Sequence, residues 1–160
     1  MENSFAQAER LAAYEDVQSV EQEHGLALPE DYKAHILKIN GGYPQRDTFP
    51  LPGDEPRQLT VNAFYPVRYG EDTLEDALDD LRDQLHPDLV PFADDAGGDQ
   101  FCLSVGPEDY GSVYYVAHEF YKPPKKAERK QPRQYGAGVL FLAPSFTAFL
   151  DGLVEVPDPA

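Results

Sequence analysis

Four stretches of the chain carry apolar residues at the spacing of an α-helix. In the first, over about residues 16–24, Asp16 can cap the first turn and Gly25 is suited to a left-handed stop. A second helix is expected from Pro29 to Ile39, because proline is tolerated in a first helical turn and the apolar residues that follow recur at i, i+4 and i+7. The chain is therefore expected to begin with two helices.

Two further helices are expected later in the chain. Thr73 is a suitable N-cap for an amphipathic helix whose apolar stripe runs from Leu74 to Leu85. Between Pro144 and Leu153, phenylalanine and leucine recur on one side of a closing helix. Both helices are expected to turn their apolar side inward.

Short apolar or aromatic stretches separated by glycine and proline predict β-strands. Between Tyr43 and Gly70 they are brief, and the later ones predict a β-meander joined by turns rich in Asp and Gly. The expected strands lie around residue 49 and at residues 59–61, 64–69, 89–93, 100–105, 112–117 and 139–143. This order of elements predicts an α+β fold with a mostly antiparallel sheet flanked by helices.

The stretch from Tyr121 to Tyr135 is rich in Lys, Arg and Pro and has almost nothing to bury, which predicts a solvated basic loop. Between Glu119 and Tyr135, six basic residues stand against two glutamates, so this stretch carries a net charge of +4. No linker or internal repeat divides the sequence. We therefore expect one domain over residues 1–160, with its core at about 16–153.

The composition is that of a soluble protein with one hydrophobic core, since 41% of the 160 residues are hydrophobic. The single cysteine, Cys102, excludes an internal disulfide and a multi-cysteine metal site. The sequence has neither the ~18 consecutive apolar residues of a membrane span nor the start of a signal peptide. We therefore expect a cytoplasmic protein that does not contact membranes.

The charge of the chain is strongly negative. Thirteen basic and 29 acidic residues give a formal net charge of −16. Such a charge repels nucleic acid and anionic membranes and attracts basic protein surfaces, so the expected partner is a cationic protein. The alternative is that the acidity only keeps the protein soluble. The segment 71–99 holds eleven acidic residues against one arginine, a net charge of −10.

The first candidate binding surface is the acidic side of the third predicted helix. Five pairs of its acidic residues stand at i, i+4, where like charges repel by about a few tenths of a kcal/mol per pair. A helix that carries such repulsion is either merely solvated or binds a cationic partner by imitating a row of phosphates. The acidic residues are Glu71, Asp72, Glu75, Asp76, Asp79, Asp80 and Asp83.

The second candidate is the glycine-rich turn that contains Asp94, Asp95 and Asp99. These carboxylates could bind a partner's basic residues or a hard cation, although their spacing does not match a calcium-binding loop. Alternatively they build the turn itself, because Asp side chains accept backbone N–H groups and Gly97 and Gly98 supply positive φ angles. Turn architecture is the favoured interpretation, followed by partner binding.

The other chemically capable residues form no catalytic or metal-binding pattern. His118 lies beside Glu119, but no further ligands stand at metal-site spacing and no nucleophile motif is present. Cys102 alternates with apolar neighbours in a predicted strand, which favours a buried thiol. Tyr115 or Tyr121 is expected to be exposed and available to a partner. We expect no catalytic residue, metal or cofactor.

Three motifs in order resemble the SUKH superfamily, which contains bacterial toxin-immunity proteins and yeast cell-wall assembly regulators. They are residues 20–32 (VEQEHGLALPEDY) running into Asn40-Gly41-Gly42, residues 89–104 (LVPFADDAGGDQFCLS) and residues 143–150 (APSFTAFL). The resemblance spans about residues 16–153 and departs from the usual pattern in the basic insertion at 121–135. It implies a strongly bent, mostly antiparallel sheet, a function in protein binding, and no catalytic residues.

The resemblance and the charge of segment 71–99 together predict an immunity protein, a monomeric antidote that neutralises a cognate toxin domain such as a nuclease. The alternative is a regulatory or scaffolding module for signalling or cell-wall enzymes, and a third interpretation is an enzyme that uses the carboxylates of the glycine-rich turn with His118. The expected partner contacts are Glu71, Asp72, Glu75, Asp76, Asp79, Asp80, Asp94, Asp95, Asp99 and Tyr115.

Overall fold

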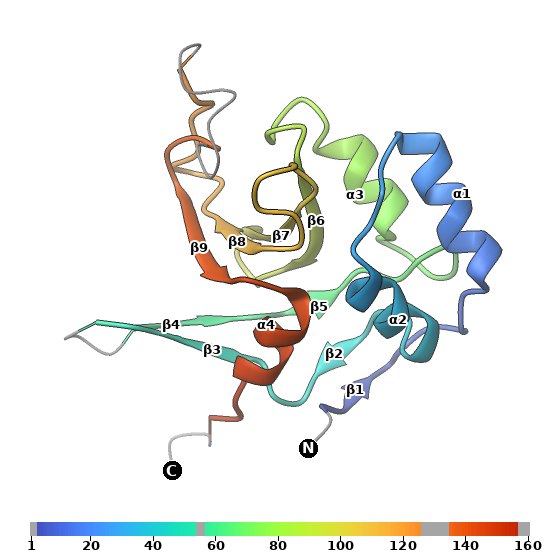
Figure 1. Cartoon of the computed structure of the whole chain (residues 1–160). Helices are drawn as coiled ribbons and strands as arrows, with labels where there is room; N and C mark the ends of the chain where they lie inside the picture. Colours follow the sequence, from blue (N-terminus) through green and yellow to red (C-terminus); the bar gives the residue numbers. More distant parts are fainter. Residues whose placement is uncertain (1–2, 54–56, 126–134, 157–160) are drawn as a thin grey trace.

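The computed structural model describes residues 3–53, 57–125 and 135–156 (Figure 1). Over these ranges the chain forms four helices and nine strands, so the predicted α+β class is confirmed. The helices are α1 (Tyr14–His24), α2 (Glu30–Lys38), α3 (Leu74–Asp80) and α4 (Phe146–Gly152). The strands are β1 (Phe5–Ala6), β2 (Tyr43–Pro44), β3 (Thr48–Leu51), β4 (Arg57–Thr60), β5 (Ala63–Phe64), β6 (Leu89–Asp94), β7 (Gln100–Ser104), β8 (Val113–Val116) and β9 (Val139–Ala143).

The described strands form three antiparallel sheets. The largest has the order β5-β6-β7-β8-β9, while β1 pairs with β2 and β3 pairs with β4. An isolated bridge between Gly42 and Phe64 connects the β1–β2 sheet to the large sheet. The pairing of β6 with β7 shifts register between Pro91 and Ala93, a bulge that bends the strand. The predicted bent sheet is thus divided into three parts.

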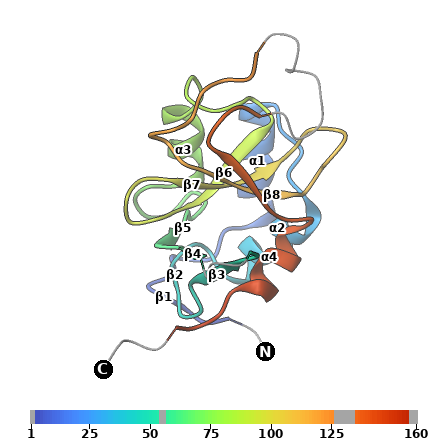
Figure 2. The ribbon, with the colours of Figure 1, turned by 90° about the vertical axis from the view of Figure 1, so that its left-hand side faces the viewer.

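The helices cover the large sheet from two directions. α3 packs on β6, and α1 lies beside α3 on the same side of the molecule (Figure 1). α2 packs against α4, which also contacts β9 and β3. In the perpendicular view, β9 crosses the front of the molecule as the last strand of the large sheet (Figure 2). The β3–β4 hairpin projects from this body as an arm (Figure 1).

The three sequence motifs meet in the main core. The ring of Tyr32 on α2 lies 5.9 Å from that of Phe92 on β6 and 5.1 Å from that of Phe146 on α4. The rings of Phe92 and Phe146 are 5.4 Å apart. All three side chains are at most 2% exposed, and aromatic pairs at such separations add to the hydrophobic energy of burial. One residue from each motif thus holds two helices on the sheet.

Asn40 explains the Asn-Gly-Gly sequence that follows α2. Its buried amide donates to the carbonyl oxygens of Arg10 (2.8 Å) and Val67 (2.9 Å) and accepts the N–H of Val67 (2.7 Å). Gly41 then adopts a φ of 75°, and a Cβ atom there would lie only 2.8 Å from Pro66. A buried amide with this many partners ties three separate segments of the chain together.

Both faces of β7 are buried, in two different clusters. Phe101 and Leu103 belong to the main core, whereas Cys102 belongs to a second cluster with Tyr114, as the alternation of side chains along a strand predicts. The prediction of a buried Cys102 is confirmed, since its exposure is 0%. Burial raises the pKa of its thiol, which makes the thiolate inaccessible at neutral pH.

The second cluster corrects one expectation about the basic stretch. Tyr135 is only 4% exposed, and its hydroxyl lies 2.7 Å from Asp109 Oδ1 and 2.8 Å from Ser104 Oγ. The Tyr114 hydroxyl donates to the same carboxylate at 2.6 Å. The stretch therefore ends on a buried tyrosine, although we had expected it to have almost nothing to bury. Residues 126–134, which hold most of its basic side chains, lie outside the described residues.

Two local expectations differ from the structure for identifiable reasons. α1 begins at Tyr14, so Asp16 caps it from the third helical position, where its carboxylate accepts the N–H of the N-cap residue at 2.8 Å. Residues 65–69 were expected to form a strand and form none. The Asn40 side chain takes both backbone groups of Val67 and leaves them unavailable for strand pairing.

Candidate functional site

The first turn of α3 uses its own acidic residues. Thr73 is the N-cap, as predicted: its Oγ1 accepts the N–H of Asp76 (3.2 Å), and Asp76 Oδ2 accepts the N–H of Thr73 (3.3 Å). Acidic side chains at the start of a helix also interact favourably with the helix dipole. Part of the acidity in this segment therefore stabilises the helix.

The helix ends at Asp80, whereas its apolar stripe had predicted an end near Leu85. Only two of the five i, i+4 pairs of acidic residues lie inside it, so the expected repulsion within the helix is smaller than the sequence suggests. These two pairs are Glu75/Asp79 and Asp76/Asp80, and each of the other three includes Glu71, Asp72 or Asp83, which lie outside the helix.

Glu75 supports the loop before α3. Its carboxylate accepts the backbone N–H of Arg68, at 3.0 Å to Oε2 and 3.3 Å to Oε1. The side chain is half-buried, and burial raises its pKa, with the neighbouring charge of Asp76 adding to the effect. Of the contact residues predicted on α3, Glu75 is the least exposed, and it has a structural role of its own.

Four exposed carboxylates lie on α3 and the turn that follows it, and one of them, Asp76, also caps the helix. We call this surface the acidic face, and it consists of Asp76, Asp79, Asp80 and Asp83. Asp79 Oδ1 lies 3.9 Å from Nδ1 of His24 at the end of α1, but the Asp79 side chain is still 68% exposed. Arg82 is the only basic residue in the sequence from 71 to 99, so the negative charge of this surface is concentrated.

The glycine turn, residues 94–99, is built by Asp95. Asp95 Oδ1 accepts the N–H groups of Gly97 and Asp99, both at 2.9 Å. Gly98 has the expected positive φ, 95°, whereas Gly97 does not have one, contrary to expectation. These contacts are those of an aspartate that stabilises a turn.

Asp99 is hydrogen-bonded through both carboxylate oxygens. Its Oδ1 accepts the backbone N–H of His118 (2.9 Å) and contacts the His118 ring nitrogen Nδ1, while the Tyr115 hydroxyl contacts Oδ2. The same hydroxyl lies 2.9 Å from Asp95 Oδ2. Burial disfavours the charge on Asp99, but the hydrogen bonds from Tyr115 and His118 outweigh it and lower the pKa of this carboxyl.

The Tyr115 hydroxyl is held by the carboxylates of the glycine turn, and the side chain is half-buried. Burial and the carboxylates of Asp99 and Asp95 raise the pKa of its hydroxyl. Tyr115 and Tyr121 are both half-buried, so the expectation of an exposed tyrosine at one of these positions is wrong. The exposed aromatic side chains in this region are Tyr110 (48%) and Phe120 (71%).

Asp94 is influenced by charges from both acidic regions. Its Oδ1 accepts a hydrogen bond from the amide of Asn62 at 3.2 Å. Burial raises the pKa of Asp94, and the charges of Asp95 and Asp72 raise it further. Asp72 precedes α3, so the start of the acidic helix and the glycine turn lie close enough for their charges to interact. Among the described residues, no ion pair joins Asp76, Asp79 or Asp80 to the glycine turn.

Two kinds of site are absent from the described ranges. No group of three or more His, Cys, Asp or Glu side chains in residues 3–53, 57–125 and 135–156 is arranged to hold a metal ion. No helix in the same ranges has the length and apolar character that a membrane span needs. The carboxylates of the glycine turn contact backbone N–H groups, Tyr115 and His118 instead.

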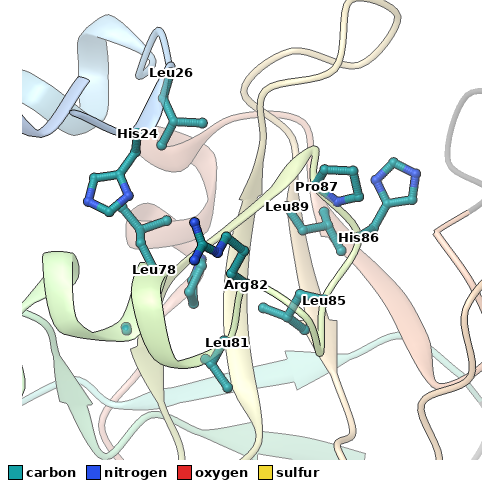
Figure 3. A pocket seen from close by; sticks show the side chains of 11 residues that line it. His24, Leu26, Leu78, Leu81, Arg82, Leu85, His86, Pro87 and Leu89 are labelled. Atoms are coloured by element: carbon teal, nitrogen blue, oxygen red, sulfur yellow. The ribbon is translucent and has the colours of Figure 1, made fainter. Parts of the chain in front are cut away.

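An apolar pocket lies beside the acidic face (Figure 3). α3 and the following turn supply Leu78, Leu81 and Leu85, and the facing walls come from the end of α1, with Leu26, and from the start of β6, with Leu89. The pocket, its open mouth included, encloses about 570 Å³. Only about 180 Å³ of this is cavity space, which is less than pockets for drug-sized ligands have and suits a single side chain.

The sequence does not predict this pocket, because the apolar stripe from Leu74 to Leu85 is expected to pack as one side of a single helix. With the helix ending at Asp80, Leu78 packs on the main core and Leu85 packs on the second cluster. Leu81 lies between them and lines the pocket, half-buried. The last turn of α3 contains acidic residues and no basic one, which is unfavourable at a helix C-terminus, so no local signal in the sequence predicts an end at Asp80.

A wider groove separates the glycine turn from the β3–β4 arm. Asp95 and Gly97 of the turn and Tyr115 on β8 line it together with residues 58–60 of β4. With its open mouth the groove encloses about 980 Å³. Two predicted contact residues therefore border a concave surface that is distinct from the apolar pocket.

Comparison with known proteins gives one family and one relative. A model of the SMI1 / KNR4 family (SUKH-1) matches residues 12–152. The chain is also similar to the SPbeta prophage-derived uncharacterized protein YokK of Bacillus subtilis (strain 168). The two are 25% identical over 161 aligned residues, which cover 89% of this chain and 75% of YokK. The range matched by the family model contains the three sequence motifs, the acidic face and the glycine turn.

Proposed function

The chain belongs to the SMI1 / KNR4 family (SUKH-1), and on this premise we propose that it is an immunity protein. It acts in the cytoplasm, where it binds the toxic domain of a cognate bacterial toxin and holds that domain inactive. The acidic face is the contact surface, and the glycine turn is a neighbouring contact. Membership in this family implies a protein partner, and the chain needs no chemistry of its own for this role.

The observation that carries the proposal is the acidic face. Four exposed carboxylates stand on one short helix and its following turn, in a segment of the sequence whose only basic residue is Arg82. A surface with one sign of charge attracts a partner of the opposite sign and speeds its association. A nuclease has a cationic substrate-binding surface because it must hold phosphates, so an acidic helix is a suitable blocker for it.

The prophage-derived relative supports the same function. A toxin and its antidote must be inherited together, and a mobile element provides that linkage. The name of YokK assigns that protein to a prophage. This origin favours an immunity function over a housekeeping scaffold for the present chain.

Rescue of growth tests the proposal. The toxin gene beside the gene of this chain is expressed in cells with and without the chain, and we expect the chain to restore growth and to elute with the toxin domain on size exclusion. Changing the four aspartates of the acidic face to asparagine should weaken binding about tenfold or more and abolish rescue. The control changes four exposed glutamates elsewhere to glutamine, with the same change in net charge: Glu15, Glu108, Glu119 and Glu155.

Three outcomes would contradict the proposal. If the wild-type chain neither restores growth nor forms a complex, it is not the antidote of that toxin. If both sets of four substitutions weaken binding equally, the total charge matters and the acidic face does not. The scaffolding alternative predicts that the gene stands apart from any toxin gene and that the chain co-purifies with signalling or cell-wall enzymes.

A further inference from the structure

We propose that the apolar pocket beside the acidic face receives one apolar side chain of the partner, presented on a segment whose adjacent residues are basic. The inference rests on the proposed function and specifies the partner further. An acidic surface alone attracts any cationic protein. A pocket within that surface selects the cationic segments that also carry a leucine, phenylalanine or methionine at the right position.

The chemistry of the pocket wall supports an apolar occupant. Eight of its eleven lining residues are apolar, and the three polar ones are His24, Arg82 and His86. Leu78, Leu81 and Leu85 are only half-buried, so each keeps apolar surface in contact with water. Covering that surface with an apolar side chain of a partner removes it from water and is therefore favourable.

The chain cannot close the pocket by itself. Leu78 is fixed in the main core and Leu85 in the second cluster, so the two ends of the α3 segment are fixed to different clusters. On the opposite side, Leu89 is buried in β6 and is fixed by strand pairing with Ser104. The pocket thus lies between two packed clusters, and its leucines on α3 and the following turn are partly accessible.

The charge around the pocket specifies the residues next to the apolar anchor. Asp79, Asp80 and Asp83 of the acidic face stand on the same helix and turn as the pocket leucines, and all three are exposed. An acidic segment would be repelled at this site, and a neutral one would gain nothing from the carboxylates. Arg82 also lines the pocket (Figure 3), and its charge repels a basic residue inside the pocket, so the partner's basic residues belong beside the apolar anchor, next to the aspartates.

The two parts of the surface are expected to act on different steps of binding. The exposed carboxylates determine the rate of association and its dependence on salt, since they act over long distances. The pocket acts after contact, when the anchor leaves water, and determines how slowly the complex dissociates. A change in the pocket should therefore raise the dissociation rate and leave the salt dependence of association unchanged.

A pair of peptides separates the pocket from the charge. The probes are acetyl-Lys-Arg-Leu-Phe-Arg-Lys-amide and acetyl-Lys-Arg-Ser-Gly-Arg-Lys-amide, which carry equal charge and differ only in the central apolar residues. With the full chain labelled at its leucine methyl groups, the first peptide should shift the NMR signals of Leu78, Leu81 and Leu85. It should also bind about tenfold more tightly than the second, the gain expected for burying one such side chain. The second peptide should leave those methyl signals in place.

Variants of Leu81 test the role of the pocket by changing the protein and keeping the peptide constant. Leu81→Trp fills the pocket and should lower the affinity for the apolar peptide to that of its Ser-Gly counterpart. Leu81→Ser shortens the same side chain, should also reduce affinity, and serves if the tryptophan variant does not fold. The matched control is Leu140→Trp, at a residue on β9 that is 39% exposed and does not line the pocket, and it should bind like the wild type. Thermal unfolding confirms that each variant is folded.

The results distinguish this inference from the proposed function. If both peptides bind equally and shift only signals of the acidic face, the pocket has no role, and the immunity function is untouched. A loss of affinity in Leu140→Trp, with none in either Leu81 variant, would place the apolar contact on β9 and overturn the inference. If neither peptide binds at low salt, the inference is also wrong, while rescue of growth decides the proposed function separately.

Discussion

The acidic face and the glycine turn have similar composition but differ in what their carboxylates contact. In the turn, Asp95 accepts two backbone N–H groups, and Asp99 is hydrogen-bonded to Tyr115 and His118. On α3, Asp79 is 68% exposed and has only a distant contact with His24, at 3.9 Å. A partner that binds the turn must first displace internal hydrogen bonds, whereas a partner that binds Asp79, Asp80 or Asp83 on the acidic face displaces mainly water.

This difference shows that the number of carboxylates in a segment does not tell whether the segment is available to bind a partner. Asp95 and Asp99 hold the turn together. Replacing either of them should therefore lower the stability of the fold as well as any binding to a partner. Asp79 and Asp80 do little for the fold and are therefore free to serve binding. The two regions should consequently respond to the same substitutions in different ways.

The largest difference between the glycine turn and the acidic face is expected in the free energy of unfolding of alanine variants. Asp99→Ala removes the acceptor for Tyr115 and for the backbone of His118, and should lower the free energy of unfolding by about 2 kcal/mol. Asp80→Ala, in the acidic face, should change it by less than about 0.5 kcal/mol. Urea denaturation followed by circular dichroism measures both values. Equal effects at the two positions would show that the turn contacts contribute nothing to stability.

Adjacent glycines in the turn provide the next comparison. Gly98 has a φ of 95°, a conformation that strains any residue with a Cβ atom, so Gly98→Ala should cost about 1.5 kcal/mol of stability. Gly97 has no positive φ, and a Cβ atom there would meet Asp95 Oδ1 at an ordinary 3.5 Å. Gly97→Ala should therefore cost less than about 0.5 kcal/mol. If Gly97→Ala proves the more harmful of the two in thermal unfolding, the described turn geometry is wrong.

The smallest effect is expected in the pH dependence of stability. The pKa of Asp99 is lower in the folded chain than in the unfolded chain, so its contribution is fully present above the unfolded pKa of about 3.9 and is lost as the pH falls through the folded value. Asp99→Asn should remove this part of the acid sensitivity, which solvent screening keeps below about 1 kcal/mol. Asp80→Asn is the control and should leave the slope unchanged. Urea midpoints between pH 5 and about pH 2 measure the slopes, and identical slopes in Asp99→Asn and wild type would contradict the assignment.

Elements whose signals are local could be predicted from the sequence. Gly25 adopts the left-handed conformation that ends α1, with a φ of 65°, and Thr73 caps α3. The alternation of β7 placed Cys102 and its neighbours on opposite faces correctly. These features depend on residues close together in the chain, so the pattern of one segment contains enough information to predict them.

Features that depend on distant partners could not be predicted in this way. Tyr135 looked like part of a solvated loop because its partner Asp109 lies 26 residues away in the sequence. Tyr115 looked available because the two carboxylates that hold its hydroxyl come from another turn. The apolar pocket could not be predicted, because Leu78 and Leu85 pack on different clusters and only the folded structure shows this.

The single thiol of the chain can also report how often the second cluster opens. Cys102 lies on β7, which pairs with β6 and β8, and its side chain is buried in the second cluster. No other thiol is present in the 160 residues. A disulfide reagent can reach Cys102 only in molecules in which the second cluster has opened, so the labelling rate reports how often that happens. A bound toxin domain that recognises the closed form would lower the labelling rate of Cys102. The rate therefore reports complex formation without a tag on either protein.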